Sequence, residues 1–285
     1  DAEKAGDHQP EISYLTGNMN WHAQYVGVVN QADDQIELSA WVSIQNNSGA
    51  TFENADLKLV AGDLHKAAPE QRVQRLDRAM VASEAPQFKQ EELFEYHLYR
   101  LERPATLKDR QIKQISLFSP QTAPAQKRFV YDGQRQQNKV RVDLEFVNSQ
   151  KNGLGMAFPK GKVRVYKKSA DGSQEFIGED QIDHTPKDER IRLTLGNAFD
   201  IVGERTVKSR ERLSSQARQE TIEISLRNHK KEDITVTVVE HFWGDWEFEG
   251  DTPTVLRRTA NLCEFQIDVG AEKETTFSFT VLYRQ

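Results

Sequence analysis

A twelve-residue segment of the chain, GEDQIDHTPKDE at positions 178–189, contains five carboxylates and one histidine. Such side chains carry general acid–base chemistry and bind metal ions, so the segment is a candidate site. If FIGEDQIDH is a strand, Asp180 and His184 share one face but lie about 13 Å apart, because a strand rises about 3.3 Å per residue. This separation is too large for two ligands of one metal, or for a carboxylate pair such as Glu179 and Asp183. We therefore expect a strand and a proline turn, which form a site only if neighbouring strands complete it.

A second segment, EHFWGDWEFEGD at positions 240–251, combines acidic and aromatic side chains. Aromatic faces beside carboxylates are typical of sugar-binding surfaces, which makes Trp243 and Trp246 candidate ligand-binding residues. The alternative is a tight turn whose rings cover the end of a sheet. Trp41 is a third ligand-binding candidate, because strand alternation places it on the polar face of QIELSAWVSIQN. The alternative for Trp41 is that the segment at 65–92 covers it.

Other catalytic and cofactor motifs are absent from the sequence. It contains no G-x-S-x-G, no phosphate-binding glycine loop, no dinucleotide glycine pattern and no H-E-x-x-H. The single cysteine, Cys263, cannot form an intrachain disulfide, and it shares strand parity with Phe265 and Ile267, which predicts a buried thiol. The histidines lack metal-ligand spacing, and only His229 and His241 are expected to meet, across one hairpin. We predict no metal site and no cofactor.

Composition narrows the class of partner. The 285 residues carry a formal net charge of -6, from 38 basic and 44 acidic residues. Without an excess of positive charge for phosphate contacts, the sequence does not favour nucleic-acid binding. The densest basic run, ERTVKSRERLSSQARQE at 204–220, is interleaved with glutamates and predicts a solvated loop; the alternative is an anion-binding arm. No apolar run approaches the roughly 20 residues of a membrane helix.

Alternation of apolar and polar residues is the dominant pattern, and it predicts an all-β protein. In ETIEISLRN, Ile222, Ile224 and Leu226 alternate with polar residues, as in a half-buried antiparallel strand. The same pattern recurs in KVRVDLEFVN, RIRLTLG, DITVTVVEHF and TTFSFTVLY. RNHKKED is expected to be the loop of one hairpin. Strands at this spacing, separated by Asn, Gly, Asp and Pro turns, favour antiparallel sandwiches.

The polar stretch DGQRQQN is the candidate boundary between two β-sandwich-like domains, at residues 11–133 and 134–285. The first domain contains a long segment, about 65–92, that lacks strand alternation. Apolar spacing allows a short helix over 70–81, but a variable, mobile excursion is the preferred interpretation. Because the sequence begins with Asp1 rather than Met, we expect its start to be a processing or truncation boundary.

Several long phrases occur together and in one order: AFPKGKVRVYKK, FIGEDQIDHTPKDERIRLTLGNAFDIVGER and EISLRNHKKEDITVTVVEHFWGDW. With ISYLTGNMNWHAQYV and FEYHLYRLERPATLKDRQIKQISLF, they resemble the domain of unknown function 4139, over about residues 11–285. The resemblance implies an all-β chain, usually the C-terminal part of an exported bacterial protein, and therefore a periplasmic or extracellular location. It assigns no catalytic residue.

From these patterns we expect a non-enzymatic module of the bacterial envelope that binds or scaffolds a protein or glycan partner. Sheet edges and loops near 65–92 and 203–219 are its expected contact surfaces. The alternative is a metal-dependent or glycan-active hydrolase, and its candidate catalytic residues are Asp180, His184, Glu240 and His241. Such a site requires several titratable groups to converge in one cavity.

Overall fold

The computed structural model describes residues 11–62, 80–81 and 88–284, which form strands and turns with one four-residue α-helix, α1 (Gly133–Gln136). The predicted all-β fold is confirmed. Contacts divide the chain into two compact units: one contains residues up to Gln24 and Ala40–Ser119, and the other contains Tyr25–Ser39 and the chain from Pro120 onward. Three strands contribute to both units: β1 (Met19–Val29), β2 (Gln35–Asn46) and β9 (Gln111–Tyr131). The domain boundary at 133 and 134 stays a prediction.

In the first unit, two small antiparallel sheets accompany the parts of β1, β2 and β9 that belong to it. β3 (Phe52–Ala55) pairs with β8 (Ala105–Leu107). β7 (Tyr96–Leu101) lies between β4 (Lys58–Ala61) and β6 (Phe88–Leu93). β5 (Met80–Val81) pairs in parallel with β9. Strand structure therefore occurs at Met80–Val81 and again from Phe88, within the segment expected to lack it, while the rest of the expected helix and excursion lies outside the described residues.

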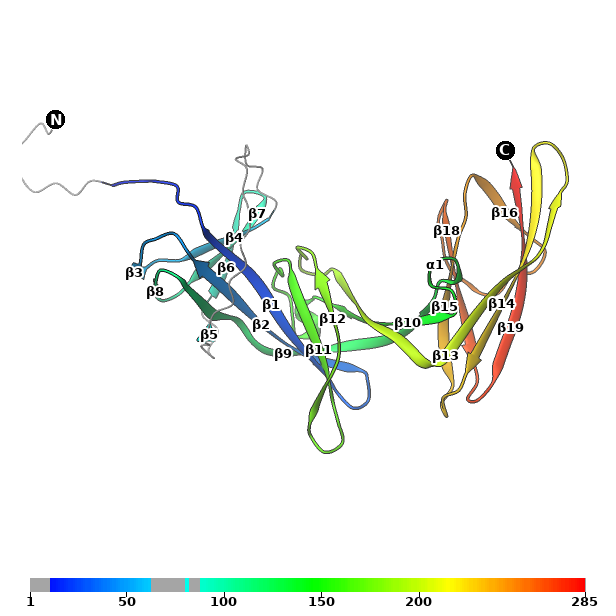
Figure 1. Cartoon of the computed structure of the whole chain (residues 1–285), viewed down its shortest axis with the longest axis horizontal. Helices are drawn as coiled ribbons and strands as arrows, with labels where there is room; N and C mark the ends of the chain where they lie inside the picture. The colour runs from blue at the N-terminus through cyan, green and yellow to red at the C-terminus, as the bar shows by residue number, and fades with distance from the viewer. Residues whose placement is uncertain (1–10, 63–79, 82–87, 285) are drawn as a thin grey trace, which may run out of the picture. The chain divides into compact units, whose positions relative to one another are not determined.

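One part of the second unit consists of strands that surround one core, and all of them except β17 (Val255–Arg258) are labelled in Figure 1. One side carries, in spatial order, β10 (Lys139–Val147), β13 (Arg190–Arg212), β14 (Ala217–Asn228), β19 (Glu274–Arg284) and β16 (Asp245–Glu249). The other side carries β15 (Ile234–His241), β18 (Leu262–Val269) and β17 (Val255–Arg258). Parallel pairing of β15 with β9, which also pairs with β10, joins the two sides.

Strand alternation explains the core of the second unit. Ile222, Ile224 and Leu226 of β14 are fully buried, as the sequence pattern predicts. Phe279 of β19 packs against Phe265 of β18, with ring centroids 5.1 Å apart. Cys263 is buried beside them, and burial raises the pKa of its thiol to about 11. The prediction of a buried thiol is confirmed, and little thiolate forms at neutral pH for such a pKa.

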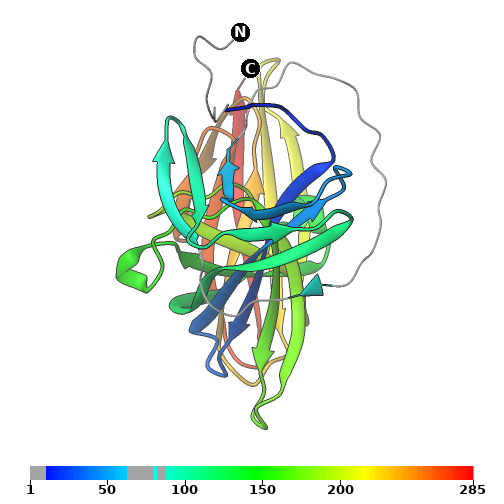
Figure 2. The ribbon, with the colours of Figure 1, turned by 90° about the vertical axis from the view of Figure 1, so that its left-hand side faces the viewer.

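The acidic segment at 178–189 belongs to an antiparallel hairpin and the connection after it. β11 (Gly161–Lys168) pairs with β12 (Gln174–Ile182), and the hairpin can be followed in Figure 2. The predicted strand is confirmed up to Ile182. Beyond it, Thr185 forms an isolated bridge with Phe158, and the chain then turns into β13.

The segment at 204–220, predicted to be a solvated loop, is mostly strand. β13 continues to Arg212 and β14 starts at Ala217, so only a short turn separates them. The pairing register explains the difference, because Arg210 lies opposite Glu220 and the two side chains form an ion pair at 3.4 Å. The interleaved arginines and glutamates of this segment were expected in a loop, but they form ion pairs between two neighbouring strands.

RNHKKED is not the loop of a hairpin, contrary to the sequence prediction. β14 pairs with β13 and β19, whereas β15 pairs with β18 and β9. The connection therefore crosses from one side of the core to the other. His229 and His241 consequently have different neighbours: the backbone N–H of His229 donates to the carbonyl of Asp200, and His241 contacts Asp132.

Candidate functional site

Glu240, a candidate from the sequence, lies in a buried polar cluster at the end of β15. Its carboxylate is fully buried and accepts hydrogen bonds from Arg205 of β13, at 2.9 Å (Nε to Oε1) and 3.0 Å (Nη2 to Oε2). Gln134 of α1 donates to the same carboxylate at 3.3 Å. Burial raises the pKa of Glu240 and outweighs the opposing effect of the Arg205 guanidinium. The carboxylate is thus held by an arginine and an amide.

His241 extends this cluster to the start of α1. Its Nε2 lies 2.8 Å from Oδ2 of Asp132, the N-cap residue of the helix, whose Oδ1 accepts the backbone N–H of Arg135 at 3.2 Å. The backbone N–H of His241 donates to Oε1 of Gln134 at 3.2 Å. These contacts fasten the short helix to β15, because a helix of this length has too few internal hydrogen bonds to hold itself. The cluster therefore has a structural role, which is to hold α1 against β15.

Tyr131 packs beside the same cluster. A Cβ atom on Gly203 would lie 2.3 Å from Cε2 of Tyr131, so only glycine allows the ring to lie against β13. The Tyr131 hydroxyl is buried and has no hydrogen-bond partner among the described residues. Burial, followed by the negative charge of Glu240, raises the pKa of Tyr131 to about 12. The phenol therefore stays protonated at neutral pH.

Asp180 and His184 make their described contacts elsewhere in the second unit. Asp180 accepts the backbone N–H of Thr194 at 2.7 Å and that of Gln181 at 2.8 Å. His184 accepts the backbone N–H of Lys160 through Nδ1 at 3.2 Å. These bonds join β12 to β13 and stabilise the approach to β11. They engage both carboxylate oxygens of Asp180 and Nδ1 of His184 in backbone contacts, and a catalytic role for either residue stays a prediction.

The three tryptophan candidates differ in exposure. Trp246 is 7% exposed, its indole N–H donates to the carbonyl of Ala260 at 2.6 Å, and the Arg258 guanidinium lies 4.4 Å from its ring centroid. Trp41, in the first unit, is half-buried on β2. Trp243 is 66% exposed. The ring of Trp246 is therefore part of the core, and Trp243 is the candidate whose ring faces solvent.

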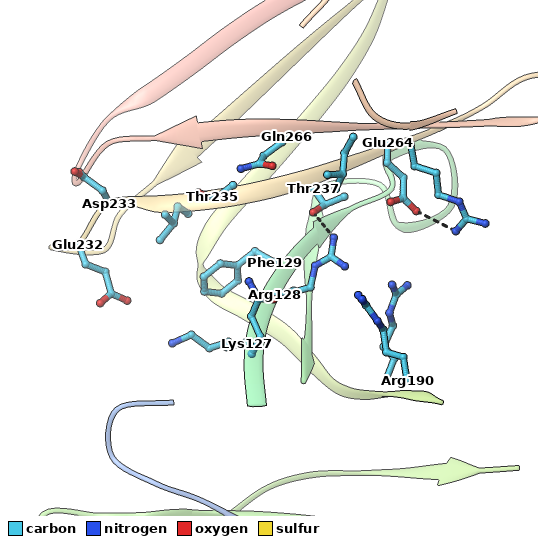
Figure 3. A pocket seen from close by; sticks show the side chains of 15 residues that line it. Lys127, Arg128, Phe129, Arg190, Glu232, Asp233, Thr235, Thr237, Glu264 and Gln266 are labelled. Carbon is cyan, nitrogen blue, oxygen red and sulfur yellow. Dashed lines mark hydrogen bonds and ion pairs between the residues drawn. The ribbon is translucent and has the colours of Figure 1, made fainter. Parts of the chain in front are cut away.

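A cavity of about 890 Å³ in the second unit gathers basic side chains that the sequence patterns did not single out. Arg128 of β9 and Arg190 and Arg192 of β13 line it, together with Thr235 and Thr237 of β15. Figure 3 shows Arg128 reaching Thr237, with Nη2 2.9 Å from Oγ1. We call this the arginine cavity.

Three arginines of the cavity share one carboxylate, that of Glu145 on β10, which is only 4% exposed. The ion-pair distances to Glu145 are 3.0 Å for Arg128, 3.2 Å for Arg190 and 2.5 Å for Arg192. Strand register explains the convergence: Arg192 lies directly opposite Glu145, while Arg128 lies two residues from the partner of Glu145 on β9. One carboxylate neutralises one guanidinium, so the cluster carries excess positive charge.

The protonation of Glu145 reflects this crowding of arginines. Burial acts to raise the pKa of Glu145, but the hydrogen bond and charge of Arg128 and the charge of Arg192 hold it below its ordinary value. Of the other carboxylates of the cavity, Glu264 lies 3.9 Å from Arg257 and Glu232 lies 2.6 Å from Lys230, while Asp233 accepts the backbone N–H of Ala271 at 2.8 Å. The excess charge at the arginines can therefore act on a ligand.

One part of this cluster was visible in the sequence. Arg190 and Arg192 alternate with Ile191 and Leu193 in RIRLTLG, and the alternation correctly predicts a strand with two arginines on one face. Their convergence on Glu145 depends on the register of β9, β10 and β13, which no local pattern encodes.

Neither a metal-binding cluster nor a membrane-spanning helix occurs in the described part of the chain. There, no group of three or more His, Cys, Asp and Glu side chains is arranged to hold a metal ion. Among the same residues, no helix has both the length and the apolar character to cross a membrane.

The strands and turns define an all-β protein whose second unit carries a basic cavity. The model of a family described as a domain of unknown function, DUF4139, matches residues 11–242, and the chain belongs to this family. The match covers most of the chain but ends before residue 285, the limit expected from the sequence phrases, so β16, β17, β18 and β19 lie beyond it. No curated protein matches the chain.

Proposed function

We propose that this protein is a non-enzymatic binding module that takes an acidic segment of a partner protein in the arginine cavity. The observation that carries the proposal is the sharing of Glu145 by Arg128, Arg190 and Arg192. Arg190 is 63% exposed and Arg192 is 43% exposed, so both present N–H donors to solvent as well as to Glu145. A guanidinium binds a carboxylate through two parallel hydrogen bonds, which makes an acidic side chain the best-matched ligand.

The neighbourhood of the arginines favours a peptide as the source of these carboxylates. Leu256 of β17 lines the same cavity and is 50% exposed, which offers an apolar contact. Among the described strands, β17 pairs only with β18, so its other edge has backbone groups available to an extended segment. Peptides often bind by adding a strand to such an edge while their side chains enter nearby pockets.

The contacts of the acid–base candidates support binding rather than hydrolysis. Glu240 forms an ion pair with Arg205, and His241 contacts Asp132. Both side chains therefore take part in the contacts that fasten α1 to β15. A general base needs a lone pair directed at substrate, and buried ion pairs of this kind are typical of structural networks. No contact among the described residues favours a hydrolase over the proposed binding module.

Fluorescence anisotropy with a labelled polyglutamate peptide tests the proposal. The wild-type protein should bind this peptide, and added salt should weaken binding because the interaction is electrostatic. Replacing Arg190→Gln and Arg192→Gln together should weaken binding at least about tenfold, since each lost charge-assisted contact is worth more than 1 kcal/mol.

A matched control removes the same charge at another place in the second unit. Lys162→Gln with Arg164→Gln on β11 disrupts exposed ion pairs to Glu179 and should leave peptide affinity within about twofold of wild type. Equal weakening by both double variants would show non-specific attraction and overturn the proposal. Failure of the wild-type protein to bind polyglutamate would also overturn the proposal.

The periplasmic or extracellular location expected from the family resemblance is part of this proposal. An envelope protein would meet its acidic partner outside the cytoplasm. Fractionation of cells producing the natural protein tests the location, and recovery in the cytoplasm would contradict it.

A further inference from the structure

A second cavity, of about 560 Å³, lies in the second unit where the β13–β14 hairpin turns. Its walls come from the end of β13, the start of β14, the end of β19 and the turn at Trp243 and Gly244. Gly244 has a φ of 72°, a left-handed conformation that favours glycine, and it directs the chain from Trp243 into β16. The turn thereby presents the Trp243 ring beside the hairpin.

The Trp243 ring has no partner within the described part of the protein. It is 66% exposed, and no hydrogen bond or ring contact joins its side chain to another described residue. Phe242 beside it is fully buried and packs on Trp246 at 4.2 Å between centroids. The core is therefore closed by Phe242 and Trp246, and the Trp243 ring is not needed to cover it.

Arginines line the same cavity as the Trp243 ring and are incompletely neutralised. Arg210 and Arg218 share the carboxylate of Glu220, at 3.4 Å and 3.8 Å. Arg212, which is exposed, donates to the backbone carbonyl of Ser214 at 3.1 Å and forms no ion pair with a described residue. Although Glu211 also lines the cavity, these three arginines exceed its two glutamates.

The geometry points to a site for a carboxylated sugar, such as a uronic acid in a polysaccharide. The C–H face of a pyranose would stack on the Trp243 ring, because weak C–H contacts favour the electron-rich aromatic face. The carboxylate of the sugar would bind the guanidinium groups of Arg212 and Arg218. Arg218 is already oriented by the Tyr283 ring, 4.6 Å below it. The site takes one ring and one carboxylate side by side, which a polyglutamate segment does not supply.

Isothermal titration calorimetry with trigalacturonate, with neutral galactotriose as the comparison, tests the site. Trigalacturonate should bind the wild-type protein at least about tenfold more tightly than galactotriose, because only the first carries carboxylates. Trp243→Ala and Arg212→Gln should each weaken trigalacturonate binding about tenfold or more. Both residues are exposed, and unchanged melting temperatures of the two variants would confirm intact folding.

Two controls make the result specific to this cavity. The Arg190→Gln, Arg192→Gln variant, which alters the arginine cavity, should bind trigalacturonate within about twofold of wild type. Polyglutamate should bind Trp243→Ala as tightly as wild type, since a peptide does not need the ring. Trigalacturonate affinity that survives Trp243→Ala, absence of binding to wild type, or loss of polyglutamate binding in Trp243→Ala would overturn the sugar assignment.

Discussion

The Arg205 guanidinium encloses the carboxylate of Glu240 with two hydrogen bonds, 2.9 Å and 3.0 Å long, where the carboxylate is fully buried and Arg205 is 15% exposed. This pair joins β13 to β15, on opposite sides of the core. Two buried charges are tolerated because each satisfies the other, and removal of one leaves its partner uncompensated.

Glu240→Ala should therefore lower the free energy of unfolding by about 3–5 kcal/mol, because it leaves Arg205 buried without its carboxylate. Glu223→Ala is the matched control, since it removes the same charge from a more exposed pair with Lys208 and should cost less than about 1 kcal/mol. Urea denaturation measures both values. A loss below about 1 kcal/mol for Glu240→Ala would show that the pair is not a structural anchor.

The two neighbouring tryptophans should respond differently to truncation. Trp246→Ala removes a buried ring and its hydrogen bond to Ala260, so a loss of about 3–5 kcal/mol in unfolding free energy is expected. Trp243→Ala removes an exposed ring and should change stability by no more than about 0.5 kcal/mol. Comparable losses in the two variants, measured by thermal and chemical denaturation, would contradict the assignment of Trp246 to the core and Trp243 to a surface site.

The Tyr131 hydroxyl should contribute nothing favourable to stability. It is buried without a described partner, so Tyr131→Phe should leave stability unchanged or raise it by up to about 1 kcal/mol. Tyr25→Phe provides the contrast, because the Tyr25 hydroxyl donates to the carbonyl of Pro159 at 2.7 Å and its removal should cost about 1 kcal/mol. Chemical denaturation measures the unfolding free energy of the two single variants. A clear decrease of this free energy in Tyr131→Phe would mean that its hydroxyl has a stabilising partner.

Stability should depend on pH through Glu145. Its pKa in the folded protein lies below the ordinary value of 4.5, so the ionised carboxylate stabilises the fold above that pH. This contribution should disappear as the pH falls through the lower folded value, where the wild-type carboxyl becomes neutral like the amide of Glu145→Gln. The difference in unfolding free energy between wild type and Glu145→Gln should thus be largest near neutral pH and shrink below pH 4.5. A difference independent of pH would exclude this role.

Features that depend on local alternation could be predicted from the sequence. Ile222, Ile224 and Leu226 are buried as expected, and so is Cys263, because side-chain parity along a strand fixes which residues face the core. The all-β class follows from the same signal. The rise of a strand per residue also excludes a site made by Asp180 and His184 alone, and the two side chains accept hydrogen bonds from different partners.

Features that depend on strand pairing could not be predicted. The charged residues at 204–220 have the composition of a loop, but the pairing of β13 with β14 places Arg210 opposite Glu220, where the two form an ion pair. Arg128 and Arg192 are 64 positions apart and meet only because β10 lies between their strands. Register is set by the whole sheet, so the arginine cavity leaves no motif in the sequence.

The most direct measurement of the proposed function is an NMR titration that observes the arginine side-chain Nε–H groups while a polyglutamate peptide is added. The proposal predicts that resonances of Arg128, Arg190 and Arg192 shift with a common affinity, while that of Arg164 on β11 does not. Shifts confined to arginines outside the cavity, or of equal size at all exposed arginines, would contradict the claim that the arginine cavity binds an acidic partner.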